Sequence, residues 1–229
     1  MNPVRARQRS AKRWLPALAC CTVATAVFLV SCRGKSPEAA GTVAAPKAAS
    51  ASRGESVDPE RPIVEIDTNL GAIRVQLDAV NAPGTVRNFL NYVGDGFYNG
   101  TLFHYVAPDR MIVGGGFLAD GQPKVSGSTV RNEAHNGLKN LRGTMAMARN
   151  VTAGIDGATS QFFINLVDSP SFDHRGEEAD EYGYCVFGKV VDGLDVGETI
   201  SHTPTRNGGG DLAQMPDPPV VIKSIRVVE

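Results

Sequence analysis

The chain has 229 residues, of which 42% are hydrophobic and 21% charged, and its formal net charge is −1 at pH 7. Five basic residues but no acidic ones precede Cys32, so the chain from Cys32 onward holds 18 basic against 24 acidic residues, a net charge of −6. Such an acidic balance argues against nucleic acid as a partner, because phosphate binding needs clustered positive charge.

The first 31 residues have the pattern of a secretory signal. A basic head, residues 5–13, precedes the apolar run Trp14–Val30, which is shorter than the roughly 20 apolar residues of a spanning helix. The run ends in Leu29-Val30-Ser31-Cys32, which is similar to a bacterial lipobox. We therefore expect residues 1–31 to be a lipoprotein signal peptide and Cys32 to be the lipidated first residue, since two or more acyl chains anchor a protein firmly. The alternative is an uncleaved anchor in which Cys32 is an ordinary buried cysteine.

The predicted location is the cell envelope, with the protein lipid-anchored and facing the periplasm. Arg33 follows the cysteine where an acidic residue often retains lipoproteins in the inner membrane, which favours the outer membrane. Residues 32–61 are rich in Ala, Pro, Ser and Gly without apolar periodicity, and we expect them to form a flexible tether. Cys185 is then the only cysteine of the following domain, and we expect a small core residue rather than a nucleophile.

Residues 62–229 have the length and pattern of one domain built mostly from short strands. Apolar residues alternate over residues 63–67 and 73–77 around a turn at 68–71, which predicts a hairpin. Val86, Phe89, Leu90 and Val93 form one helical face within residues 82–93, with Pro83 in the first turn. Further strands are expected at residues 102–106, 111–114, 144–148, 161–166, 184–191 and 220–228, and a second helix at 195–200. So many short strands favour a closed barrel.

Four sequence blocks, in matching order and spacing, resemble the cyclophilin family of peptidyl-prolyl isomerases. They are FHYVAPDRMIVGGGF (residues 103–117), GTMAMAR (143–149), ATSQFFIN (158–165), and FDH (172–174) followed by VFGKV (186–190). The resemblance implies a mainly β fold, a closed eight-stranded antiparallel barrel capped by two α-helices, with the active face outside. It also implies peptidyl-prolyl cis-trans isomerase activity on X-Pro bonds, here those of extracytoplasmic proteins during folding.

Cis-trans isomerisation of an X-Pro bond requires no nucleophile, general base or metal. Rotation about an X-Pro bond has a barrier near 20 kcal/mol because of amide resonance. A catalyst needs an apolar pocket for the proline ring and a donor that favours the twisted amide. We therefore expect no cofactor and no metal, proline-containing polypeptide segments as partners, and a monomer.

The resemblance also assigns a site. Met111, Phe163 and Phe172 would line the proline pocket, and Gln161 would bind the substrate backbone. Residues before the proline would lie over Ala148, Arg149 and Asn150, while Val113 and Tyr184 occupy positions at the rim. Phe163 and Met111 could instead be core residues, but successive side chains of a strand point in opposite directions. One of Phe162 and Phe163 must therefore point outward.

Three positions depart from the family pattern: its arginine is Tyr105, its phenylalanine Arg110 and its glutamine Val113. Tyr105 offers one neutral donor where arginine offers a charged fork, which predicts a rate reduced by about a hundred- to thousandfold. Arg110 could supply the missing cation, or be an ordinary exposed arginine. The alternative function is a proline-peptide-binding chaperone or scaffold without catalysis. The acidic segment 175–182 is explained by solvation or by partner binding.

Overall fold

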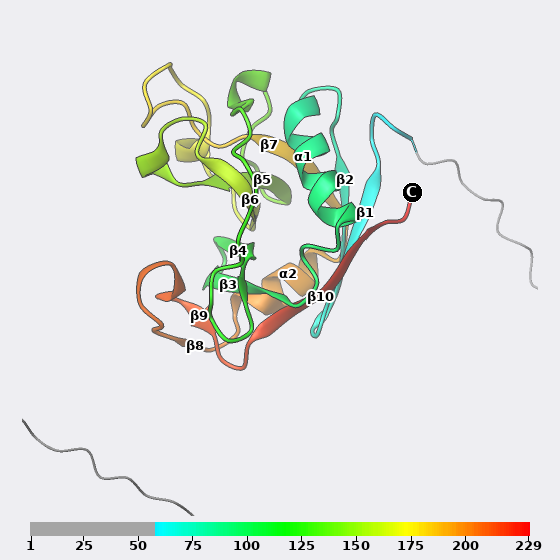
Figure 1. Cartoon of the computed structure of the whole chain (residues 1–229), viewed down its shortest axis with the longest axis vertical. Helices are drawn as coiled ribbons and strands as arrows, with labels where there is room; N and C mark the ends of the chain where they lie inside the picture. Colours follow the sequence, from blue (N-terminus) through cyan, green and yellow to red (C-terminus); the bar gives the residue numbers. More distant parts are fainter. Residues whose placement is uncertain (1–57) are drawn as a thin grey trace, which may run out of the picture. The chain divides into compact units, whose positions relative to one another are not determined.

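The computed structural model describes residues 58–229 (Figure 1). The predicted signal peptide, Cys32 and the tether up to residue 57 lie outside the described residues. Neither helix of the described part has the length and apolar character needed to cross a bilayer. The main strands are β1 (Ile63–Thr68), β2 (Gly71–Leu77), β3 (Thr101–Ala107), β4 (Met111–Leu118), β5 (Thr144–Arg149), β6 (Ala158–Asn165), β7 (Val186–Asp192) and β10 (Val220–Val227).

These eight strands form a closed antiparallel barrel in the order β1-β10-β3-β4-β6-β5-β7-β2. β2 pairs back onto β1, so no edge of the sheet is left open. A separate small hairpin pairs β8 (Thr205–Arg206) with β9 (Met215–Pro216). The barrel confirms the fold class expected from the sequence.

Two helices cover opposite ends of the barrel (Figure 1). At one end, Asn88 of α1 (Pro83–Gly94) donates through Nδ2 to the carbonyl oxygen of Thr159, near the start of β6, at 2.7 Å. At the other end, a Cβ on Gly197 of α2 (Leu194–Ser201) would lie 3.5 Å from Leu166, just beyond the end of β6. The helices therefore close the two openings through which water could reach the interior.

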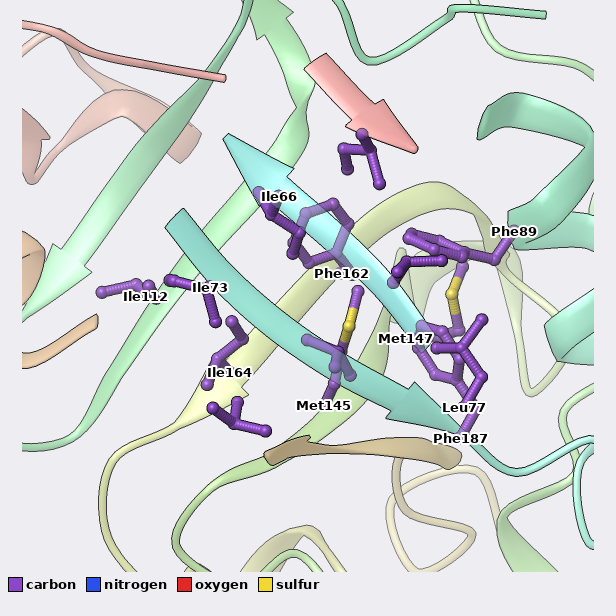
Figure 2. Packing of buried hydrophobic residues seen from close by; sticks show 14 of the residues in the cluster. Ile66, Ile73, Leu77, Phe89, Ile112, Met145, Met147, Phe162, Ile164 and Phe187 are labelled. Carbon is purple, nitrogen blue, oxygen red and sulfur yellow. The ribbon is translucent and has the colours of Figure 1, made fainter. Parts of the chain in front are cut away.

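The barrel interior is filled by apolar side chains that alternate along each strand, as the period of a β-strand requires. Figure 2 shows Phe89 of α1 among side chains that the strands contribute, including Phe162 and Phe187. The Phe89 ring lies 5.8 Å from that of Phe162, edge to face, and 5.3 Å from that of Phe187. Such aromatic contacts add to the free energy gained by area burial alone.

Glu133 completes the first turn of α1, which lacks a capping side chain of its own at Ala82. Its carboxylate accepts hydrogen bonds from the backbone N–H of Gly84 at 3.1 Å, and from the N–H and hydroxyl of Thr85 at 2.8 and 2.7 Å. A negative charge here also complements the helix dipole. These hydrogen bonds hold the loop around Glu133 against the first turn of α1.

Several boundaries differ from those expected. β6 begins at Ala158 rather than 161, and β4 continues past Gly114 to Leu118, which pairs with Thr101 of β3. The strand expected at 184–191 begins only at Val186, so Tyr184 precedes it. The β8–β9 hairpin was not predicted, since two-residue strands leave no periodic signal.

Candidate active site

β6 separates the interior from an outer face that faces solvent and loops. Phe162 is completely buried inside the barrel, while its neighbour Phe163 belongs to a second apolar cluster outside it. Thr159 and Gln161, at two-residue spacing from Phe163, are half-buried on the same outer face. The alternation expected for the two phenylalanines is therefore confirmed, and Phe163 is not part of the barrel core.

A cavity of about 730 Å³ lies on this outer face, across β3, β4, β5 and β6. Six of the residues assigned to the site by sequence line it: Tyr105, Val113, Ala148, Arg149, Asn150 and Gln161. The structure thus brings together Tyr105, Gln161 and the stretch 148–150, which the resemblance assigned to one site. Met111 and Arg110 are not among its lining residues.

Three aromatic residues that the sequence assigned to the site, Phe163, Phe172 and Tyr184, are also absent from the cavity lining and form a cluster beside it. The Phe163 ring lies 5.8 Å from that of Phe172 and 5.6 Å from that of Tyr184, and the latter two are 5.1 Å apart, all edge to face. Val113 and Ala148 pack against this cluster and also line the cavity. Phe163 is only 3% exposed, and the rings of Phe172 and Tyr184 pack edge to face against it. The apolar end of the site is thus nearly closed by its own side chains.

Tyr105 and Val113 face each other directly across β3 and β4. The pairing shifts register between Phe103 and Tyr105, a bulge that turns Tyr105 toward the outer face. Tyr105 and Val113 therefore form one patch of the cavity wall, with a neutral phenol and an isopropyl group where the resemblance predicted a cation and an amide. This wall holds no charged side chain at either position.

Arg110 lies at the turn between β3 and β4, where Asp109 adopts a positive φ of 57°. Its side chain is exposed. Met111, the next residue, is half-buried on β4 opposite Ala107 and Asn165. Arg110 in the turn and Met111 at the start of β4 do not line the cavity, which begins on this strand at Val113.

Arg149 is the cation that lines the cavity. Its Nη1 donates to the carbonyl oxygen of Gly154 at 3.2 Å and its Nη2 to that of Ala179 at 2.6 Å. The guanidinium carbon lies 5.2 Å from the centre of the Tyr184 ring, within cation–π range. Its buried Nε has no hydrogen-bond partner within residues 58–229. Arg149 thus joins the acidic segment 175–182 to the aromatic cluster.

Two ionisable groups near the site are held neutral by burial. Desolvation lowers the pKa of His104 to about 4, and its ring packs 4.6 Å from that of Phe117. Desolvation likewise raises the pKa of the Cys185 thiol to about 11. His104 is therefore an uncharged structural residue of the cavity wall, and Cys185 is a buried thiol, as expected from the sequence.

Gly116 lets the chain approach Gln161 closely. A Cβ at this position would lie 2.5 Å from the Gln161 side-chain carbon Cδ, closer than any real contact. The third glycine of the run 114–116 therefore leaves the space that the Gln161 side chain occupies.

Other residues of the site carry no sequence signal that we used. Asn140 is buried and donates from its backbone to Asp173 Oδ1 at 2.8 Å and from Nδ2 to the carbonyl oxygen of Phe172 at 3.1 Å. Asn165 in turn donates to Asn140 Oδ1 at 3.2 Å. This buried network holds the Phe172 turn against β6. Thr129, Gly210 and Asp211 also line the cavity, from loops distant in the sequence.

Comparison with known proteins agrees with this geometry. Residues 63–227 match the model of the cyclophilin-type peptidyl-prolyl cis-trans isomerase family. Peptidyl-prolyl cis-trans isomerase A of Dickeya dadantii is 48% identical over 166 residues, which cover 72% of this chain and 84% of that protein. Peptidyl-prolyl cis-trans isomerase B of Escherichia coli is 45% identical over 167 residues, covering 73% of this chain and all of that protein.

A solved structure shares the fold as well. A Cryptosporidium parvum cyclophilin-type isomerase, crystallised in the presence of the dipeptide Ala-Pro, is 27% identical with a TM-score of 0.60, covering 73% of this chain and 99% of that one. The barrel, its outer cavity and these relatives lead to one conclusion. The chain belongs to the cyclophilin family and is a peptidyl-prolyl cis-trans isomerase.

Proposed function

We propose that this isomerase acts on X-Pro bonds of polypeptides outside the cytoplasm, tethered by lipid on Cys32, at a rate lowered by Tyr105. One observation carries the lowered rate: the cavity wall made by Tyr105 and Val113 has no charged donor. The structure solved in the presence of Ala-Pro supports a proline-containing substrate for this chain too.

The remaining cation does not replace the missing one. Arg149 uses both terminal nitrogens on backbone carbonyls of residues 154 and 179. A donor acts in catalysis only if it is aimed at the group that changes during the reaction. Arg149 therefore shapes the groove, while Tyr105 supplies a single neutral hydroxyl.

Substitution of Tyr105 by arginine tests the lowered rate. We expect Tyr105→Arg to raise kcat/KM for a proline peptide by about a hundredfold, since a preorganised donor is worth on the order of 3 kcal/mol. Tyr105→Phe is the matched control, because it keeps the ring and removes only the hydroxyl. A wild-type rate already equal to that of Tyr105→Arg would refute the proposal.

Arg110 remains a candidate for partial compensation. If it contributes, Arg110→Ala lowers the residual rate; an unchanged rate assigns it to the solvent-exposed surface, as its position at the turn favours. The full-length protein in detergent micelles is suitable for both measurements.

The alternative function is binding without catalysis. The aromatic cluster and Gln161 favour it as a second candidate, because they supply peptide contacts that need no cation. A wild-type protein that binds a proline peptide yet leaves its isomerisation rate at the uncatalysed value would establish this alternative instead.

The tether is tested separately. We expect mass spectrometry of the mature protein to find an acylated N-terminal Cys32, and fractionation to place it in the outer membrane. A mature form that begins at any other residue contradicts the lipid anchor.

A further inference from the structure

A second cavity, of about 540 Å³, lies beside the first. One wall is α1 and the other is the segment 127–131, and Thr129 lines both this cavity and the first. The two cavities therefore meet at Thr129. A peptide that leaves the first cavity in this direction enters the second.

The second cavity is held in shape by hydrogen bonds on both sides. The N–H of Gly127 donates to the Tyr92 hydroxyl of α1 at 2.8 Å. Ser126 Oγ donates to the Thr159 hydroxyl at 3.1 Å, and Asn88 Nδ2 to the Thr159 carbonyl oxygen at 2.7 Å. These contacts join α1, the 126–129 segment and β6. A preformed cavity of this kind loses little free energy in ordering when a ligand binds.

Two arginines line this cavity, Arg87 from α1 and Arg131 from the opposite wall. Both side chains are exposed, and within residues 58–229 neither forms an ion pair or a side-chain hydrogen bond. The nearby Glu133 is engaged by the first turn of α1. Asp95, the one acidic lining residue, is eight residues beyond Arg87, roughly 12 Å along the helix axis. The arginine end of the cavity is therefore free to accept an anion.

The distance to the aromatic cluster sets which part of a substrate reaches this cavity. Asn88, which lines the second cavity, is hydrogen-bonded to Thr159, and Thr159 is four residues from Phe163 along β6, roughly 13 Å. An extended peptide covers that distance in about four residues. The family resemblance places the residues before the proline over Ala148–Asn150. The second cavity lies beside that stretch, because its lining residue Val130 pairs with Ala158, which also pairs with Arg149.

We propose that Arg87 and Arg131 form a subsite for a glutamate or aspartate side chain located about four residues before the substrate proline. The proposal rests on the proposed function, since it assumes that the groove holds a proline-containing polypeptide. It assigns this chain a preference for acidic sequences upstream of proline. Each exposed ion pair is worth little alone, so the preference is a few-fold and depends on both arginines.

Peptide binding tests the subsite. The probes are capped peptides with one Ala-Pro, carrying glutamate three, four or five residues before the proline, each paired with its glutamine counterpart. With the full-length protein in detergent at low salt, we expect the best glutamate peptide to bind about three- to tenfold more tightly than its counterpart. The preference should shrink as salt is added, because the arginines are exposed.

Variants identify the source of the preference. Arg87→Gln combined with Arg131→Gln should bring the affinity ratio of the two peptides to one, and Arg87→Glu with Arg131→Glu should reverse it. Arg61→Gln is the matched control, because Arg61 is exposed but lies just before β1, across the barrel from β6. Circular dichroism checks that each variant is folded.

Two results would overturn the subsite: equal affinity for both peptides in the wild type, or a preference that survives the double variant. Neither affects the proposed function if the neutral peptide is bound and isomerised. If the neutral peptide is neither bound nor isomerised, the proposed function fails, and the subsite fails with it.

Discussion

The inside of the barrel and the face that carries the cavity share the same strands but depend on different interactions. Along β6, Phe162 packs among other apolar side chains, and only its volume and shape matter there. Phe163, one residue later, lies with Phe172, Tyr184 and the cavity-lining Val113. Two adjacent phenylalanines therefore belong to two separate apolar clusters, one inside the barrel and one beside the cavity. The alteration at Tyr105 affects the second region and leaves the first intact.

The sharpest test of this comparison replaces the two phenylalanines in turn. We expect Phe162→Ala to lower the free energy of unfolding by about 3–5 kcal/mol, because a completely buried ring leaves a cavity in the barrel. Phe163→Ala should cost less stability but more activity, since its ring adjoins the substrate cavity. Urea unfolding and peptide isomerisation measure the two effects. Equal losses of activity per folded molecule would contradict the separation of the two regions.

Glu133 connects the loops around the cavity with the helix that closes the barrel. Removal of its carboxylate in Glu133→Ala leaves three donors of the first turn of α1 unsatisfied. We expect a loss of about 1–2 kcal/mol in the free energy of unfolding. Glu178→Ala, at an exposed glutamate of the acidic segment, should change stability by less than about 0.5 kcal/mol. If Glu133→Ala is as stable as this control, water molecules accept the hydrogen bonds of Gly84 and Thr85 equally well, and the prediction is wrong.

The third prediction concerns the outer face away from the cavity. Glu65 on β1 lies directly opposite Arg74 of β2 and Arg226 of β10, and hydrogen bonds from Arg226 and then Arg74 lower its pKa. A lowered folded-state pKa means that the carboxylate favours the folded state. Its contribution is therefore complete above the unfolded pKa of about 4.3 and disappears as the pH falls through the lower folded value.

We expect this contribution to reach at most about 1 kcal/mol after solvent screening. It appears as a loss of wild-type stability between pH 5 and acid that Glu65→Gln does not show, measured by urea unfolding at a series of pH values. A variant with the same acid dependence as the wild type would assign that dependence to other carboxyl groups.

The smallest effect is expected at Phe172, whose ring helps to cover Phe163. Phe172→Leu replaces the ring by a smaller side chain and leaves more of Phe163 accessible. It should lower KM for a proline peptide a few-fold, with a change in the free energy of unfolding below about 1.5 kcal/mol. Phe172→Tyr, which keeps the ring, is the control. An unchanged KM would show that the rings already move aside at no cost when substrate binds.

Much of the fold could be predicted from the sequence because its signals are local. The alternation at Ile73, Val75 and Leu77 and the helical face that includes Phe89 follow from periods of two and 3.6 residues, and their burial is confirmed. The fold and the family followed from the resemblance of four blocks, and the structure and the relatives confirm both. The roles assigned to the site residues stay predictions, although six of these residues, Tyr105 included, line one cavity.

The rest depends on contacts between residues far apart in the chain. Asn140 meets Asp173 after 33 residues, and Glu133 meets Gly84 after 49. A single asparagine or glutamate belongs to no repeating sequence pattern, so the sequence does not indicate its distant partner. Arg110 shows the converse, since its place within the signature block suggested a role, whereas the β3–β4 turn carries it beyond the cavity.

The barrel can close only after the last strand has been synthesised, because β1 pairs with β10. Val64 lies opposite Val227, near the other end of the domain. During synthesis from the N-terminus, one edge of β1 and one edge of β3 therefore stay unpaired until the ribosome has released residues 220–227, which form β10. Exposed strand edges invite pairing with other chains. Pairing of β10 therefore covers the strand edges through which a newly synthesised molecule could aggregate.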